Sequence, residues 1–438
     1  MGEGVLSAAE VSGGDPAALF ADAGLAREGA MLHMGGVALD DIADAVGTPA
    51  YIYNAEAIRA RYRVLDEAFA AVPHRIHFAV KANGNLGVLR VLRDAGAGAD
   101  IVSGGELARA LAAGFAADHV VFSGVGKTVE ELRIAARAGV GHVNVESLEE
   151  LELLGRVAAG EGASVRVGIR VNPDVTTDTH PYISTGSSGI KFGVPLDLVG
   201  DAAAIIRRLP ALRLTTIAMH LGSQLTDAAP FAQGVAKLTE LIGRIRGMGI
   251  DTLSSIDIGG GLGIRYRDEP ALDPAAFASA IIPLIAPLGL TLELEPGRFL
   301  VGSAGVMLTT VLYRKASGGK SFVVVDAGMN DLLRPSHYEA YHAIVELQRQ
   351  ERASERVDVV GPVCETGDFL ALDRELPDVA PGERLAMLGA GAYGFVMSSN
   401  YNSRPRAPEV IVDGGRFWIA RPRETTESLF AGERAAPE

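Results

Sequence analysis

The sequence predicts an α/β fold, a (β/α)8 barrel of the TIM type followed by a C-terminal β-rich domain. The 438 residues exceed one ordinary domain and suit a barrel plus a second unit. Between residues 76 and 298, eight short apolar runs alternate with helical patterns, whereas strands and turns dominate the chain after residue 298. A doubly wound sheet is the competing arrangement, and the even eightfold alternation favours the barrel.

The eight apolar runs are rich in β-branched residues and are bounded by Gly, Asn or Pro, as expected of buried parallel strands. They are IHFAV (76–80), ADIV (99–102), HVVFSG (119–124), HVNVES (142–147), VRVGIRVN (165–172), LTTIAMHLG (214–222), SIDIGGG (255–261) and LTLELEPGR (290–298). The intervening segments have apolar residues at helical spacing. Thr128 with Glu131, and Ser147 with Glu150, each fit a capping box that opens a helix.

The C-terminal part has the pattern of a β-rich domain. Residues 410–412 and 417–420 flank Asp413-Gly414-Gly415, which predicts a hairpin. The first 30 residues are rich in Gly, Ala and acidic side chains and are expected to form a loosely held arm. The predicted boundaries are an N-terminal arm that partly joins the β domain (1–47), the barrel (48–302) and the β-rich domain (303–438).

Composition and charge narrow the class of protein. The formal net charge of -14 disfavours nucleic acid or an anionic membrane as the main partner. The single cysteine, Cys364, excludes an internal disulfide. No apolar stretch approaches the roughly 20 residues that cross a bilayer, and the N-terminus lacks the basic start and apolar run of a secretory signal. We therefore expect a cytoplasmic protein with a small-molecule partner.

In a barrel of this kind, function gathers at the C-terminal ends of the strands. The predicted strands end there in Lys81, in His220 to Ser223, in Gly259 to Gly261, and in Glu295 to Arg298. A lysine at the barrel mouth is expected to be desolvated and nucleophilic, although most lysines are solvated surface residues. Three consecutive glycines allow backbone N–H groups to approach an anion, or merely form a tight turn. The convergence of all four at one rim indicates a site.

Two segments of the β-rich part add candidate residues. Cys364 and Glu365 lie in GPVCETGD, whose flanking residues do not resemble a core, so a reactive thiol is at least as well supported as a buried one. Tyr393 lies in a Gly-rich turn, where it could pack on the surface or reach a ligand.

Seven motifs in order resemble those of the diaminopimelate decarboxylase family, which belongs to the alanine-racemase-like pyridoxal-phosphate (PLP) enzymes. They are FAVKAN (78–83), MHLGSQ (219–224), IGGGLG (258–263), EPGR (295–298), RPSHY (334–338), GPVCETGD (361–368) and GAY (391–393). The resemblance spans the chain from about residue 30 to residue 425. It implies PLP as the cofactor, no metal, and a homodimer with shared active sites, Cys364 and Glu365 entering from the other subunit.

The resemblance also implies a role for each matching residue. Lys81 would hold PLP as a Schiff base, His220 would stack on its ring, and Glu295 would pair with the pyridine nitrogen. The phosphate would bind Ser223, Gly259, Gly260, Gly261 and Gly297, with Asp100, Arg170, Arg298 and Tyr393 as further cofactor contacts. The substrate would bind Arg298, Arg334, Tyr338, Glu365 and Tyr393. Lys81 and Cys364 would be the catalytic residues.

The implied reaction is decarboxylation of meso-2,6-diaminopimelate to L-lysine and CO2, the last step of lysine biosynthesis. A protonated ring nitrogen makes PLP an electron sink for this chemistry, Cys364 suits reprotonation of the α-carbon, and two arginines suit a second substrate carboxylate. The alternative is a decarboxylase of the same fold that acts on ornithine, lysine, arginine, carboxynorspermidine or a carrier-bound amino acid. A racemase is disfavoured by Glu295, and an inactive homologue by the retained lysine and cysteine.

Some positions depart from the family pattern. Phe78 stands where Tyr is common, and Phe299 follows EPGR where a small residue is common, which could alter the pocket rim. Ser336 and His337 are unusual in the specificity segment. The Gly- and Ser-rich segment 184–191 has the composition of a loop that could close over a substrate.

Overall fold

The computed structural model describes residues 15–175 and 191–433, which form two compact units. The β-rich unit contains the described residues up to Ile58, Arg265–Glu269, and the chain from Val301 onward. The barrel unit contains Arg59–Ile264 and Pro270–Leu300. The chain thus enters the barrel unit after Ile58, whereas the sequence placed its start at residue 48. Most of the segment 184–191 lies outside the described residues.

The barrel unit is a closed barrel of eight parallel strands, as predicted. The strands are β5 (His74–Ala79), β6 (Gly98–Ile101), β7 (Val120–Phe122), β8 (His142–Val145), β9 (Val165–Val171), β10 (Leu212–Met219), β11 (Ser255–Asp257) and β12 (Thr291–Leu294). Each corresponds to one of the predicted apolar runs. Their side chains are almost all buried, because one face of each strand fills the barrel and the other packs under a helix.

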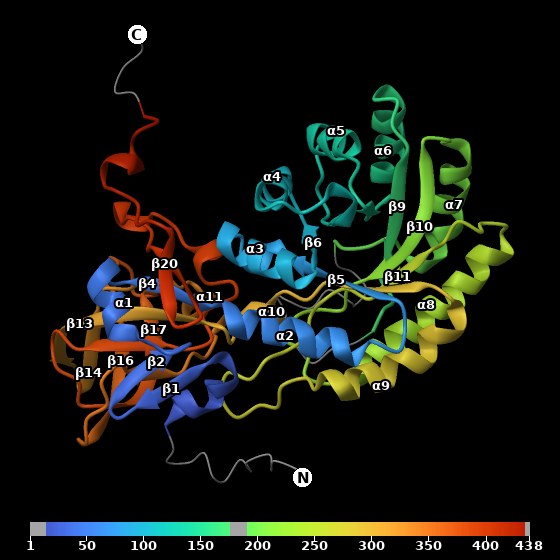
Figure 1. Ribbon diagram of the computed structural model, residues 1–438. Helices are drawn as coiled ribbons and strands as arrows, with labels where there is room; N and C mark the ends of the chain where they lie inside the picture. The colour runs from blue at the N-terminus through green and yellow to red at the C-terminus, as the bar shows by residue number, and fades with distance from the viewer. Residues whose placement is uncertain (1–14, 176–190, 434–438) are drawn as a thin grey trace. The chain divides into compact units, whose positions relative to one another are not determined.

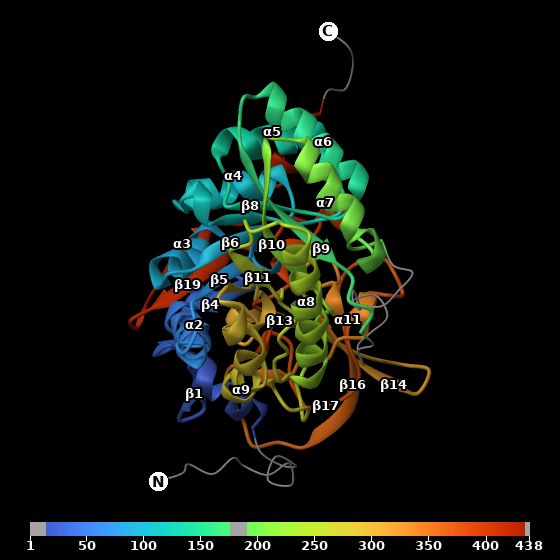
Figure 2. The ribbon, with the colours of Figure 1, turned by 90° about the vertical axis from the view of Figure 1, so that its right-hand side faces the viewer.

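Helices connect the barrel strands and lie around them (Figure 1). They are α2 (Ala55–Ala68), α3 (Leu86–Ala95), α4 (Gly104–Ala113), α5 (Val129–Ala138), α6 (Leu148–Gly160), α7 (Val199–Arg208), α8 (Ala229–Gly247), α9 (Pro274–Ile285) and α10 (Arg298–Val301). Neighbouring helices such as α8 and α9 pack side by side (Figure 2). The predicted capping box at Thr128 is complete. That at Ser147 is half formed, because the Glu150 carboxylate binds Lys127 and the backbone N–H of Glu146 instead.

The β-rich unit is built on a sheet in the order β17-β16-β14-β13-β4-β19-β20, to which β18 and β15 are joined through β13. The strands are β4 (Ala50–Asn54), β13 (Gly305–Ser317), β14 (Lys320–Val325), β15 (Ile344–Glu346), β16 (Ser354–Val360), β17 (Phe369–Pro377), β18 (Arg384–Met387), β19 (Glu409–Asp413) and β20 (Arg416–Arg421). The predicted hairpin is β19 and β20, paired antiparallel. The short helix α11 (Arg334–Tyr338) also belongs to this unit.

The described part of the N-terminal arm is ordered by contacts with the β-rich unit. It forms the 3-10 helix η1 (Pro16–Ala23), the three-stranded sheet β1 (Leu25–Glu28), β2 (Met31–Met34) and β3 (Val37–Ala38), and helix α1 (Leu39–Val46). The Arg27 guanidinium donates to the carbonyl of Glu346, and the Leu32 N–H donates to the carbonyl of Leu347. The prediction of a loose arm up to residue 30 is therefore wrong for residues 15–30, because these contacts offset the entropy of ordering the segment.

None of the helices among residues 15–175 and 191–433 is both long enough and apolar enough to cross a membrane.

Candidate functional site

Lys81 lies in a short 3-10 turn, Val80–Ala82, that directly follows β5. Its Nζ is 3.2 Å from Asp100 Oδ2 at the end of β6, so two sequence-predicted residues meet. Asp100 is fully buried, whereas the Lys81 side chain is 35 % exposed. Within one chain the lysine side chain is therefore only partly desolvated, and its amine lies beside a fully buried carboxylate.

Glu295 follows β12 and is buried inside the barrel. Burial, together with the negative charges of Asp100 and Asp257, raises the pKa of Glu295 well above its ordinary value. Ser123 donates a hydrogen bond to Glu295 Oε1 over 3.2 Å. Because a protonated carboxyl is both donor and acceptor, Glu295 can exchange a proton with a basic group placed beside it.

Asp257 is a site residue that the sequence did not reveal. It lies at the end of β11, hydrogen-bonds to the Glu295 side chain, and has a pKa raised to about 7 by burial and by Glu293. The backbone N–H of Gly259 donates to its Oδ1 over 2.8 Å, and Asn144 Nδ2 donates to its Oδ2 over 3.2 Å. Its position two residues before the predicted glycine loop was the only available signal. Asp257 and Glu295 form a hydrogen-bonded pair that holds less negative charge than two separate carboxylates.

The glycine loop after β11 packs against the segments that follow β10 and β12. Gly259 and Gly261 have φ of +72° and +96°, a region that side chains strain. A Cβ on Gly260 would overlap the carbonyl oxygen of Glu295, so the loop requires glycine here. The Gly260 N–H donates to His220 Nδ1 over 3.2 Å. The glycines therefore allow a close backbone approach and fix the ring of His220.

His220 follows β10 and is half-buried. Burial lowers the pKa of its imidazole well below the ordinary value, and the charges of Arg170 and Lys81 lower it further. A neutral ring results, which accepts from the loop N–H at Nδ1 and can stack on a flat ligand.

Arg298, at the start of α10, is buried and donates from Nη2 to Ser223 Oγ over 3.1 Å. The contact joins two predicted residues, with Gly297 immediately before the helix. Phe299 is 1 % exposed and lies against the Arg61 guanidinium, 5.4 Å from the ring centroid. The expectation that Phe299 lies at the pocket rim is wrong, because its side chain packs into the core of the barrel unit.

Arg170, at the end of β9, donates from Nη1 to Glu146 Oε1 over 2.8 Å. Glu106, on α4, is a second residue that the sequence did not reveal. Burial raises its pKa to about 7, although it accepts the Val102 N–H over 2.8 Å and lies near Lys81. No sequence motif identifies Glu106 as a site residue, because the residues around it come from other parts of the chain.

Arg334 and Tyr338 lie on α11 in the β-rich unit. The Arg334 guanidinium is buried, donates from Nη1 to His342 Nε2 over 2.8 Å, and lies over the Tyr266 ring at 4.9 Å. His342 Nδ1 in turn donates to the Leu388 carbonyl over 2.8 Å, so this imidazole is neutral. A buried guanidinium held by a neutral ring is suited to an anionic ligand group.

Cys364 and Glu365 lie in the exposed turn between β16 and β17. The turn is fixed by the Asp368 carboxylate, which accepts the N–H groups of Met329 and Val363 over 2.6 and 2.5 Å. The Cys364 N–H donates to Asn402 Oδ1 over 2.8 Å. The thiol is therefore presented to solvent by a well-ordered turn rather than buried in a core.

Tyr393 follows β18 in the Gly-rich turn of the β-rich unit and is half-buried, with a left-handed φ of 57°. That conformation is uncommon for a residue with a side chain and is associated with functional sites.

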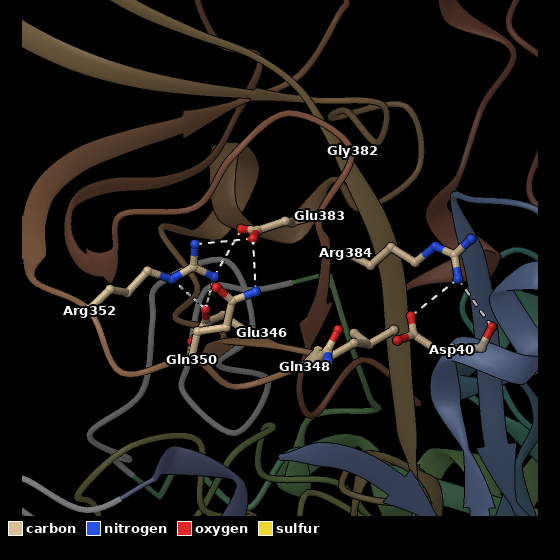
Figure 3. A pocket seen from close by; sticks show the side chains of 9 residues that line it. Asp40, Glu346, Gln348, Gln350, Arg352, Gly382, Glu383 and Arg384 are labelled. Carbon is tan, nitrogen blue, oxygen red and sulfur yellow. Dashed lines mark hydrogen bonds and ion pairs between the residues drawn. The ribbon is translucent and has the colours of Figure 1, made fainter.

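A hollow of about 230 Å³ in the β-rich unit contains none of the predicted residues (Figure 3). Its arginines are already paired: Arg352 Nε contacts Glu346 Oε1 at 3.0 Å, and Arg384 Nη1 contacts Asp40 Oδ1 at 3.1 Å. Glu383 also pairs with Arg352, at 2.9 Å. The charges in this hollow satisfy one another, so it offers no uncompensated group for a ligand.

Comparisons with known proteins agree with this geometry. Residues 55–302 match the family described as "Pyridoxal-dependent decarboxylase, pyridoxal binding domain". The diaminopimelate decarboxylase of Pseudomonas aeruginosa is 50 % identical over 409 residues, which cover 93 % of this chain and 98 % of that protein.

Two solved structures cover most of the chain. The diaminopimelate decarboxylase of M. jannaschii, in complex with L-lysine, has a TM-score of 0.90 and 34 % identity over 94 % of this chain and 98 % of that one. That of Helicobacter pylori, also complexed with L-lysine, has a TM-score of 0.87 and 38 % identity over 90 % and 99 %.

Proposed function

Because this chain belongs to the diaminopimelate decarboxylase family of pyridoxal-phosphate enzymes, we propose that it converts meso-2,6-diaminopimelate to L-lysine and CO2, the last step of lysine biosynthesis. The observation that carries the proposal is the buried Glu295, hydrogen-bonded to Asp257 and within electrostatic reach of Lys81. A buried carboxyl group at this place can share a proton with a basic ring nitrogen and, as the carboxylate, sustain its protonated form.

The residues at the strand ends fit pyridoxal phosphate. A Cβ on Gly260 or Gly261 would overlap backbone oxygens, so the loop packs closely on its neighbours. Glycine loops of this kind can accept a phosphate on their N–H groups. Lys81 provides a primary amine for the cofactor aldehyde, and the neutral ring of His220 can stack on its pyridine. The proposed phosphate contacts are Ser223, Gly259, Gly260, Gly261 and Gly297; the further cofactor contacts are Asp100, Arg170, Arg298 and Tyr393.

In the proposed mechanism, bound pyridoxal phosphate supplies an electron sink for the pair of electrons that CO2 leaves behind. Glu295 would keep the ring nitrogen of the bound cofactor protonated, and Asp257 and Ser123 hydrogen-bond to its carboxyl group and orient it. Asp100 keeps the Lys81 amine within 3.2 Å of its own carboxylate, where it can exchange with the substrate amine. The Cys364 Sγ delivers a proton to the substrate α-carbon.

Substrate recognition is assigned to the β-rich unit and to Arg298. Arg334, held by His342, would bind the distal carboxylate in a bidentate fork, with Tyr338 and Tyr393 as further contacts. Glu365 would bind the distal amine. A substrate without a distal carboxylate would offer Arg334 no anionic group to bind, which disfavours ornithine, lysine and arginine.

The proposal includes a homodimer with shared active sites in the cytoplasm. Cys364 and Glu365 are exposed to solvent, whereas proton delivery benefits from a site that excludes water. Large apolar side chains are also exposed on the β-rich unit, and a second subunit would cover them. They are Val396, Tyr401, Trp418, Ile419 and Phe430.

The test is CO2 release by the cofactor-loaded protein from meso-diaminopimelate, with L-ornithine, L-lysine and L-arginine in parallel. Release from diaminopimelate alone, with lysine as product, is expected. Release only from another amino acid would overturn the proposed substrate but would still support the proposed class of reaction. No release from any of the four would overturn the reaction itself.

A further inference from the structure

Four ionisable side chains that bear no role in the proposed reaction, or only a positioning one, lie inside the barrel. They are His77 on β5, His142 on β8, Asp257 on β11 and Glu293 on β12, and all are buried. His142, Asp257 and Glu293 each offer one ligand atom, and these atoms lie within 4.8 Å of one another. The neighbouring strands β11 and β12 thus bring carboxylate oxygens close to an imidazole from β8 on the other side of the barrel.

The spacing of these atoms is that of metal ligands rather than of hydrogen-bond partners. Glu293 Oε2 is 3.7 Å from His142 Nδ1 and 3.6 Å from His77 Nε2, both beyond hydrogen-bond length. Zinc–nitrogen and zinc–oxygen bonds of about 2.0–2.2 Å in a tetrahedron put ligand atoms about 3.4 Å apart. Small side-chain shifts would therefore bring the donors onto one ion.

A second observation points to a ligand at the same place. Among the described residues, His77 Nε2 and Glu293 Oε2 are buried, lie 3.6 Å apart and have no hydrogen-bond partner. Burial of polar atoms without partners is costly and rare in proteins. Two such atoms facing each other indicate a group that belongs between them.

The surrounding chain leaves room for the rings and orients one of them. A Cβ on Gly98 would overlap His77 Nδ1, and a Cβ on Gly168 would overlap Asn144 beside His142. His77 Nδ1 is 3.3 Å from the His119 carbonyl, and this contact leaves Nε2 facing the cluster.

A cavity of about 40 Å³ leads to the cluster from the N-terminal ends of the strands, enough for one ion or water. Arg75 and Arg166 line it as well, and their charges oppose a cation. Both residues are exposed, so solvent screens that repulsion.

We propose that His142, Asp257 and Glu293 bind one divalent cation, with His77 as the adjoining fourth ligand. Two imidazoles with carboxylate oxygens form a borderline donor set that suits Zn²⁺ better than Mg²⁺ or Ca²⁺. Four protein ligands leave no coordination position open for a substrate, so the ion takes no part in the decarboxylation. Its role is to stabilise the barrel by joining β5, β8, β11 and β12.

The test is equilibrium dialysis of the purified full-length, cofactor-loaded protein against Zn²⁺, followed by elemental analysis and thermal unfolding. We expect one retained Zn²⁺ per chain and a raised melting temperature. Glu293→Gln and His142→Asn should lose the retained ion. Two controls should keep it: His119→Asn, which changes an exposed imidazole nearby, and Cys364→Ser, which removes the one thiol.

Failure of the parent protein to retain stoichiometric Zn²⁺ would overturn the proposal, and this result needs no variant to fold. Retention of the ion by Glu293→Gln, or its loss in Cys364→Ser, would also overturn it. Metal content is measured independently of CO2 release, so the outcome is separate from that of the proposed function.

Discussion

The strand ends of the barrel and the Cys364 turn of the β-rich unit carry the proposed chemistry in opposite environments. At the barrel rim, Asp100 and Glu295 are buried and make contacts within their own unit. Cys364 and Glu365 are exposed, on a turn whose backbone is nevertheless fixed by Asp368. In the proposed mechanism, the cofactor site is therefore preorganised within one chain, whereas the proposed proton donor would become effective once the proposed partner subunit covers it.

The largest effect is expected at the barrel rim. Lys81→Ala removes the amine that anchors the cofactor, so the visible absorption of the bound cofactor should vanish and activity should fall by about 1,000-fold or more. Absorption spectra and CO2 release measure this. Lys315→Ala, on an exposed position of β13, should behave like the parent protein. Survival of the absorption band in Lys81→Ala would show that the cofactor is anchored elsewhere.

Substitution of Cys364 should lower the turnover rate without loss of the bound cofactor. Cys364→Ala removes the proposed proton donor, and kcat should fall by roughly 10²- to 10⁴-fold while the absorption spectrum is retained. Steady-state kinetics and spectra on the same sample separate the two. An unchanged kcat would show that Cys364 is not the proton donor. Loss of the cofactor absorption band would contradict the claim that the barrel rim binds the cofactor independently of Cys364.

Arg334 should affect substrate binding more than turnover. Arg334→Ala removes a buried charged donor worth about 1.5–3 kcal/mol, so kcat/KM for diaminopimelate should fall roughly 10- to 150-fold, mainly through KM. Arg356→Ala, an exposed arginine paired with Asp373 on the same unit, is the matched control. An equal effect of the two substitutions would contradict a role for Arg334 in recognition.

The smallest expected effect is on the free energy of unfolding and concerns Glu106, near Lys81 at the barrel rim. The pKa of Glu106 is raised to about 7, so the folded protein holds this proton more tightly than the unfolded chain. Below about pH 4.5 the protonated carboxyl makes its whole contribution to the free energy of unfolding. This contribution is lost as the pH rises through about 7, which lowers the free energy of unfolding by about 1–3 kcal/mol.

Glu106→Gln should remove that part of the pH dependence, as measured by denaturant unfolding at pH 5 and pH 8. Glu130→Gln, an exposed glutamate on α5, should retain it. The same pH dependence in parent and Glu106→Gln proteins would show that the carboxyl is not protonated in this interval.

The sequence predicted the repetitive part of the fold well. Each barrel strand is a short, buried, β-branched run with its own helix, so local pattern alone locates it. Residues 15–30 were predicted wrongly because their order comes from contacts with Glu346 and Leu347, more than 300 positions away. Such contacts leave no local pattern.

The site was predictable where residues directly follow a strand within a motif, as for Lys81, His220 and Glu295. Glu106, Glu293 and His142 carry no such mark, because their chemistry arises from burial beside residues of other strands. For the same reason the partial exposure of Lys81 within one chain could not be predicted, because it depends on the side chains around it and not on its place after β5. Phe299, likewise, is buried by Arg61 and its neighbours and not by its motif.

The most direct test of the account mixes two inactive variants, Lys81→Ala and Cys364→Ala. If each active site combines Lys81 of one subunit with Cys364 of its partner, dissociation and random reassembly should restore up to about a quarter of parental activity, since half the dimers carry one intact site. Neither variant alone should recover. No recovery in a mixture that demonstrably exchanges subunits would contradict shared active sites and place both residues on the same chain.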